Sequence, residues 1–286
     1  MTTAVQVLAN GLLYGSVLSL VSVGISLVFG VMNVLNFAQG AMVAIGVYLG
    51  YFVVGQAGWP LIVAVPLGVL AGLALGVLAQ RVALYRISSV EPLRPLLATF
   101  GLGLLVVGLL GALFTTDIRA YEGPLRGSLN LGGVKLPTQS VALGLAGLAI
   151  VGVIYYVVYH SRFGLGLRAT TQHREAAASC GVNLDKMDAI AFGLGTAIAV
   201  GGGVLLSIRY PAYPTIGDAW LLQGLVAAII GGLRSILGGV VGAMVVGVVF
   251  TALTYVTGNS QVASLLIYVT LGLLILVRGG GVLKQA

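Results

Sequence analysis

The chain has 286 residues, of which 59% are hydrophobic, only 7% are charged and 44 are glycine. A soluble protein has about 25% charged residues, which help to cover its surface. Residues 1–80 and 235–277 contain neither a charged residue nor a histidine, so water cannot be their solvent. This composition excludes soluble enzymes, secreted disulfide-bonded proteins and nucleic-acid-binding proteins. It predicts an all-α polytopic membrane protein surrounded by membrane lipid.

Apolar windows of about 20 residues, the length that crosses a bilayer as a helix, follow one another along the chain. We place them at 5–29, 37–54, 61–80, 96–115, 141–159, 187–207, 219–231, 238–256 and 262–277. The seventh is short for a span and glycines flank it, which is typical of a broken or re-entrant segment. We therefore predict eight to ten transmembrane helices, broken or re-entrant segments included, in one membrane domain covering 1–286.

The formal net charge of +7 indicates orientation, because basic residues of membrane proteins gather in cytoplasmic loops. Most basic residues lie between or after predicted spans, at Arg81, Arg86, Arg94, Arg162, Arg168, Arg174, Lys186, Arg234, Arg278 and Lys284. The intervening segment 116–139, which includes Arg126, has three basic and two acidic residues with glycine and proline turn signals, which is typical of an external loop. We therefore expect an external N-terminus and a cytoplasmic C-terminus.

Glycine recurs at a regular spacing in the third predicted span. Gly68, Gly72 and Gly76 are four residues apart, so all three lie on one side of a helix. Such a row forms a groove in which another helix backbone can approach closely. We predict that this span packs against protein on its glycine side.

Residues that carry enzyme chemistry are scarce. None of the three lysines follows a glycine, so the phosphate-binding loop G-x-x-x-x-G-K-[ST] is absent. Cys180 is the single cysteine, so no internal disulfide can form, and no metal site or cofactor is indicated. We expect a protein that is not an enzyme. A secondary transporter or channel for a small neutral solute, acting without ATP, is one alternative, although such proteins normally need an ion site or a selectivity filter.

The first polar stretch inside the apolar chain is 30–40. Asn33, Asn36 and Gln39 recur every third residue, and Gly40 follows, which places the three amides along one side of a helical segment. Unpaired amides are costly in a membrane interior. They either hydrogen-bond to a neighbouring helix or line the path of a polar solute that is not strongly charged.

The second polar stretch is the loop 160–186. Thr170 or Thr171 can cap a short helix, Glu175 is favourable in its first turn, and Gly181 can end it in the left-handed conformation. Asn183 then caps the next span. The stretch is either a solvated loop or a docking surface for a cytosolic protein.

Three motifs in this chain resemble those of one family. Glu175-Ala176-Ala177 followed by Gly181 matches the E-A-A-x-x-x-G core of ABC importer permease loops, and the flanking 162–164 and 167–170 are similar to the permeases of branched-chain amino-acid importers. Segments 27–40 and 226–242 resemble two further motifs of that family, in the same order. The chain departs from it at Gln39-Gly40-Ala41, where many members have His-Gly-Glu, and it lacks the distal I-x-L-P part of the general loop.

The resemblance, which is to the high-affinity H-type permease, implies a permease subunit in the bacterial inner membrane. Its partners would be a second permease, identical or paralogous, two cytoplasmic ABC ATPases and a periplasmic solute-binding protein. The loop 160–186 would receive the ATPase stroke through Arg174, Glu175, Ala176, Ala177 and Gly181. Asn33, Asn36, Gln39 and Gly40 would line the translocation path for branched-chain amino acids or a similar small polar solute. Segments near 36–46 and 236–247 would be related by an inverted repeat.

Overall fold

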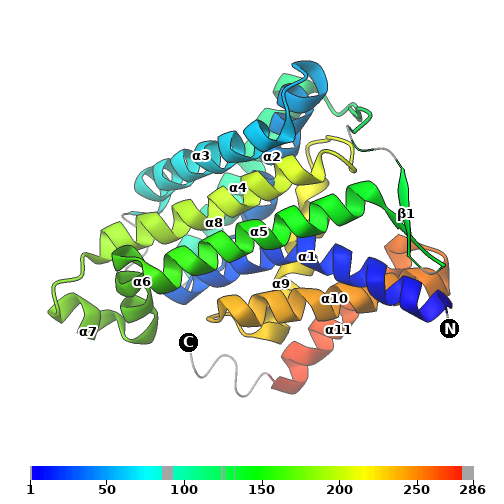
Figure 1. The fold of residues 1–286 in the computed structure, drawn as a ribbon. Helices are drawn as coiled ribbons and strands as arrows, with labels where there is room; N and C mark the ends of the chain where they lie inside the picture. Colours follow the sequence, from blue (N-terminus) through cyan, green and yellow to red (C-terminus); the bar gives the residue numbers. More distant parts are fainter. Residues whose placement is uncertain (1, 86–92, 124, 126, 132, 279–286) are drawn as a thin grey trace.

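The computed structural model describes residues 2–85, 93–123, 125, 127–131 and 133–278, so Arg86, Arg126 and Lys284 of the predicted loops lie outside it. The described chain is a helical bundle with one small β-hairpin (Figure 1). The helices are α1 (Thr2–Met32), α2 (Gln39–Gly50), α3 (Leu61–Ala79), α4 (Leu93–Phe114), α5 (Thr138–His160), α6 (Arg162–Gln172), α7 (Arg174–Ser179), α8 (Leu184–Leu206), α9 (Ile216–Gly231), α10 (Ile236–Thr257) and α11 (Ser260–Arg278). Short π-helical turns, η1 (Tyr51–Gln56) and η2 (Gln80–Leu84), extend α2 and α3.

All nine predicted apolar segments are helical. Among the described residues, seven helical spans are long and apolar enough to cross a membrane, and two shorter apolar helices accompany them. One of the two is α9, the segment expected to be broken or re-entrant. The prediction of an all-α polytopic membrane protein is therefore confirmed.

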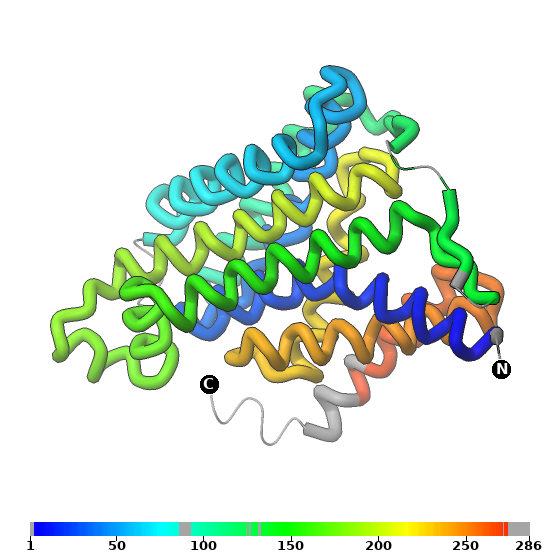
Figure 2. Tube along the Cα trace, in the orientation of Figure 1, coloured from blue at the N-terminus to red at the C-terminus, as the bar shows by residue number. Residues whose placement is uncertain are grey.

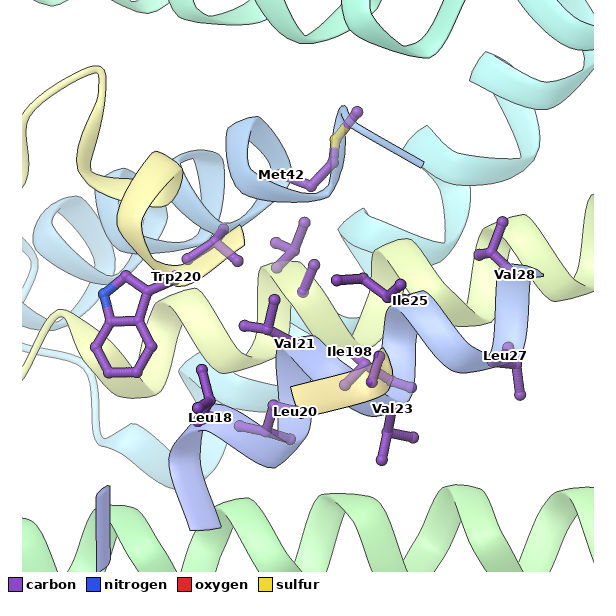
Figure 3. Packing of buried hydrophobic residues seen from close by; sticks show 14 of the residues in the cluster. Leu18, Leu20, Val21, Val23, Ile25, Leu27, Val28, Met42, Ile198 and Trp220 are labelled. Atoms are coloured by element: carbon purple, nitrogen blue, oxygen red, sulfur yellow. The ribbon is translucent and has the colours of Figure 1, made fainter. Parts of the chain in front are cut away.

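The core is built around α1 and α8. In the most apolar 18-residue stretch of each helix, 78% and 89% are buried, respectively. Apart from the charged first turns of α8, both helices carry only apolar and small polar side chains over most of their surface, which is typical of a helix that is surrounded by protein. Figure 3 shows side chains of α1 beside Ile198 of α8, with Trp220 of α9 and Met42 of α2 in the same buried cluster. The outer helices are much more exposed. In α4, only 17% of the most apolar 18-residue stretch is buried.

The glycine row of the third span faces α8. A Cβ atom at Gly72 would lie 2.8 Å from the Cα of Ala197 and 2.8 Å from the carbonyl oxygen of Thr196. At Gly76 it would lie 2.8 Å from the Cα of Gly193. Because these neighbours are backbone atoms, the two helices can approach this closely only where no side chain separates them.

The order of elements occurs twice, and the second set runs in the opposite direction. Each set has a core helix, a short helix and two further helices. The first set is α1, α2, α3 and α4, and the second, in the same order, is α8, α9, α10 and α11 (Figure 1). The packing follows the same correspondence, because α1 packs most extensively on α10 and α8 on α3. The counterpart of 36–46 is thus α9, and not 236–247 as the sequence suggested. Both α2 and α9 follow a core helix after a non-helical break, at 33–38 and 207–215, whereas 236–247 begins a long helix.

The two polar loops lie at opposite ends of the bundle (Figures 1 and 2). Segment 116–139, expected to be an external loop, contains a hairpin that the sequence did not predict, with β1 (Ser128–Leu131) antiparallel to β2 (Val134–Pro137). Gln6 of α1 fastens the hairpin, because its side-chain amide donates to the carbonyl of Lys135 and accepts from that residue's N–H, at 2.5 and 2.8 Å. The start of α1 and the hairpin therefore share one end, and α6 and α7 lie at the other.

The exposed native Cys180 allows a direct test of the predicted orientation. In spheroplasts, a membrane-impermeant maleimide should leave the wild-type chain unlabelled, because its only cysteine lies on the α7 side. The variant Ser128→Cys in a Cys180→Ser background should label nearly completely from outside, since Ser128 is exposed on the hairpin. The reversed pattern would invert the orientation.

Candidate functional site

The short helix of the polar loop begins later than the sequence predicts. Thr170 and Thr171 do not cap it, because they lie inside α6, where their hydroxyls donate to carbonyl oxygens four residues earlier, at 2.9 Å each. The N-cap of α7 is His173, whose Nδ1 accepts from the N–H of Ala176 at 3.3 Å. The prediction failed because histidine is not among the preferred capping residues, and because Ser161 starts a separate helix by accepting from the N–H of Gly164 at 2.9 Å.

The end of α7 matches the sequence prediction. Gly181 adopts a positive φ of 84°, and the N–H of Val182 donates to the carbonyl of Ala177 at 3.0 Å. Asn183 then caps α8, because its Oδ1 accepts from the N–H of Lys186 at 3.0 Å. This pair of caps sets α7 at a fixed turn from the core helix that follows it.

An ion pair that the sequence did not reveal ties α7 to the core. The guanidinium of Arg174 donates to both carboxylate oxygens of Asp188, at 2.8 and 2.5 Å. Hydrogen bonding to Asp188 raises the pKa of Arg174 above its usual value. The same guanidinium donates to the carbonyl oxygen of Val31 at 3.0 Å. Arg174 therefore joins α7 both to α8 and to the last turn of α1.

The five predicted coupling residues divide between two sides of α7. Glu175, Ala176 and Gly181 are exposed, whereas Ala177 is buried against the bundle and Arg174 is half-buried in its ion pair. Asp188 is only 2% exposed and was not predicted as a site residue. An acid at the start of an apolar span was its only sequence signal.

The break after α1 does not hold a single row of three amides. Asn33 is in the left-handed region with a φ of 55°, a conformation that asparagine tolerates. This turn ends α1 and interrupts the helical spacing on which the prediction depended. Asn33 is exposed, and its Oδ1 accepts from Arg234 at 2.9 Å.

Asn36 and Gln39 point into the bundle. The Nδ2 of Asn36 donates to the Oε1 of Gln39 at 3.2 Å, while its Oδ1 accepts from the N–H of Ala38 at 3.0 Å. The Nε2 of Gln39 continues the chain of bonds to the carbonyl of Gly195 in α8, at 3.1 Å. Gly40 lies against α9, where an added Cβ would be 2.8 Å from the carbonyl oxygen of Gly217. The paired amides thus bond the break and the start of α2 to α8, and Gly40 packs the start of α2 against α9.

A cavity of about 330 Å³ lies beside these elements, between α1, α5, α6 and the start of α10. Arg168 and Arg234 line it, and the guanidinium of Arg168 lies 5.2 Å from the centre of the Tyr159 ring. The Oγ of Ser26, which also lines the cavity, is buried without a hydrogen-bond partner. The α6 end of the bundle therefore has a polar, positively charged recess next to the break.

Together, these elements define the class: a multi-pass membrane transport subunit in which an exposed loop helix is bonded to a broken core helix. The chain belongs to the family described as "Branched-chain amino acid transport system / permease component", which matches residues 7–277. It is an ABC importer permease of that family. Proteins of this family are transport subunits and not enzymes, so the resemblance inferred from the three motifs is confirmed.

Named relatives cover most of the chain. The high-affinity branched-chain amino acid permease LivH of Escherichia coli K12 is 26% identical over 98% of this chain and 95% of its own length. A probable LivH of Methanocaldococcus jannaschii is 26% identical over 92% and 85%. The autoinducer 2 import permease LsrD of Klebsiella pneumoniae is 32% identical over 75% of this chain and 66% of its own length.

Proposed function

We propose that this permease forms part of the translocation path for branched-chain amino acids or a similar small polar solute. It acts in the bacterial inner membrane with its N-terminus outside and its C-terminus in the cytoplasm. Two separate cytoplasmic ABC ATPases drive it, and a second permease and a periplasmic solute-binding protein complete the importer. The names of its relatives support this range of solutes, because they include both branched-chain amino acid and autoinducer 2 permeases.

The observation that carries the proposal is the bonding of α7. Its exposed side, with Glu175 and Ala176, is available to a cytosolic partner. Its inner side is bonded through Arg174 to Asp188 of α8 and to the end of α1. A force on α7 therefore reaches both core helices directly, and α1 ends at the non-helical break. Coupling through rigid elements that can take two arrangements is a common way to transmit a distant event.

The break supplies the second part of the proposal. Asn36 in the break, with Gln39 and Gly40 at the start of α2, would form a wall of the path, as residues at unwound segments do in other transporters. We expect the path to open when these hydrogen bonds, including that of Gln39 to Gly195 of α8, are broken. A change in the position of α1 relative to α8 would exchange the Gln39–Gly195 bond for a bond to the solute.

A substitution at Gly181 can test coupling, because it should change the orientation of α7 without preventing the permease from folding. A valine in the left-handed region costs roughly 1 kcal/mol or more, so Gly181→Val should tilt α7 relative to α8. In reconstituted vesicles with all subunits, solute-loaded binding protein should lose most of its stimulation of ATP hydrolysis, and uptake should fall with it. Basal ATPase activity and permease insertion should be unchanged.

The matched control is Gly181→Asn. Asparagine tolerates this conformation, and a Cβ at Gly181 would meet no atom within 4 Å, so coupling should be retained. Glu175→Lys tests the exposed side of the same helix and should uncouple, whereas Glu175→Gln should have a smaller effect. Normal coupling in both Gly181→Val and Glu175→Lys would refute the docking role of the loop. Uptake without any ATPase would instead favour the alternative, a secondary transporter or channel.

A further inference from the structure

A larger cavity lies at the opposite end of the bundle, beside the hairpin. It has a volume of about 470 Å³, within the range of roughly 300–1,000 Å³ that is usual for sites of small molecules. Residues of α1, α9 and α10 line it, and β2 and the start of α5 lie at its edge. No residue of the coupling loop or of the break at 33–38 lines it, whereas Arg209 and Tyr210 of the break at 207–215 do.

One wall of the cavity is aromatic. The ring of Tyr14 is stacked between Trp220 and Phe250, with centroids 5.1 and 4.7 Å away. Tyr210 meets Trp220 edge-on at 5.4 Å. Such a wall buries an apolar group, and its ring faces also attract an ammonium group.

Hydrogen bonds hold this wall in place. The hydroxyl of Tyr14 donates to Oε1 of Gln223 at 2.5 Å, and Nε2 of Gln223 donates to Oγ of Ser264 in α11 at 3.2 Å. Gln223 is only 2% exposed and Trp220 only 6%. The site is therefore formed before any ligand arrives, which lowers the entropic cost of binding.

The charged residues in the described lining of the cavity are all basic. Its described lining includes Arg209 and Lys135 and no aspartate or glutamate. Arg209 is exposed at the edge of the cavity and hydrogen-bonds to Oγ of Ser140. A guanidinium has five N–H donors in a planar fork that matches a carboxylate, so its bonds to Ser140 and Tyr210 do not exhaust its capacity.

We propose that this cavity is a binding site, within one permease, for a small solute that combines a carboxylate with an apolar side chain. Arg209 is the carboxylate partner, and the Tyr14–Trp220–Phe250 wall receives the apolar group. The inference rests on the proposed function and makes it more specific, because it favours an amino acid over an uncharged sugar-like solute. Lys135 adds positive potential at the mouth, where the hairpin is fastened to α1.

Trp220 allows a direct test on the full chain. The chain has two tryptophans, and Trp59 is exposed, so a Trp59→Phe variant leaves Trp220 as the only reporter. In phosphatidylcholine vesicles, without the binding protein, L-leucine should change Trp220 fluorescence saturably. L-leucinol, which lacks the carboxylate, should bind at least roughly tenfold more weakly, because it loses a charge-assisted bond.

Substitutions then locate the carboxylate. Arg209→Gln should weaken L-leucine binding roughly tenfold and remove most of the preference over leucinol, whereas Arg209→Lys should keep part of it. The matched control is Arg81→Gln, an exposed arginine outside this cavity, which should leave the titration unchanged. Equal responses to leucine and leucinol would overturn the carboxylate assignment.

Three other outcomes distinguish this site from its alternatives. A Trp220 signal that responds to added phosphatidylglycerol and not to leucine would overturn the proposal in favour of a lipid headgroup. Leucine uptake by the complete importer with no Trp220 response would also overturn the site, while the proposed function stands. A saturable, carboxylate-dependent response in a chain that supports no ATP-driven uptake would support the site and refute the proposed function.

Discussion

Replacing Gly72 by leucine should separate α3 from α8 and lower the free energy of unfolding by about 3 kcal/mol or more, above the usual cost of overpacking. The reason is that the new side chain would meet the backbone of α8, since the Cα of Ala197 and the carbonyl of Thr196 lie 2.8 Å from the position of its Cβ. Backbone atoms cannot rotate away as a side chain would. The measurement is the midpoint of thermal unfolding in mild detergent, together with the yield of monodisperse protein.

Gly108→Leu is the matched control for this change. Gly108 also lies in a membrane-spanning helix, α4, but a Cβ there would meet no atom within 4 Å. The same increase in side-chain volume should therefore leave the midpoint nearly unchanged. Equal losses in both variants would mean that the α3–α8 contact does not determine the effect.

Asp188→Asn should have the second large effect. It removes the charge from a carboxylate that is 2% exposed and leaves the guanidinium of Arg174 without its bidentate partner. Breaking a fully buried pair costs about 3–5 kcal/mol. Because Arg174 is 35% exposed, solvent screening reduces the expected loss to about 2 kcal/mol. Coupling should fall as well, since the ion pair joins α7 to α8.

The matched control is Asp185→Asn, three residues earlier on α8. Asp185 is exposed in the first turn, where its charge interacts with the helix dipole, an effect of about 0.3–1 kcal/mol, and more weakly than Asp188 with the charge of Arg174. Thermal midpoints and solute-stimulated ATPase activity should both change little. If Asp188→Asn behaved like Asp185→Asn, the ion pair would have no part in fixing α7.

The membrane-spanning segments could be predicted because they depend on local composition. A run of about 20 apolar residues is stable as a helix in lipid whatever its neighbours are, and all nine predicted segments are helical. The left-handed turn at Gly181 and the cap at Asn183 were also predictable, because each depends on the conformational preference of one residue. His173 as a cap was not, since that position depends on where α6 ends.

The candidate site was only partly predictable. Spacing placed Asn33, Asn36 and Gln39 together, but a left-handed turn at Asn33 directs this residue to Arg234 and leaves the other two paired inside the bundle. Whether a helix breaks at one asparagine depends on the surrounding packing, which spacing does not contain. The aromatic cavity likewise unites Tyr14, Trp220 and Phe250 from three distant segments, and no local pattern connects them.

The sequence by itself determined that this protein resides in a membrane, that it is helical and that its polar loop resembles a coupling loop, because composition and short motifs are local properties. Only the tertiary structure decided which helices form the core, that α2 corresponds to α9, and that Arg174 meets Asp188. Those contacts join residues on different helices, most of them far apart in the chain. They form because close glycine packing and the cost of a buried unpaired charge select one arrangement of otherwise similar apolar helices.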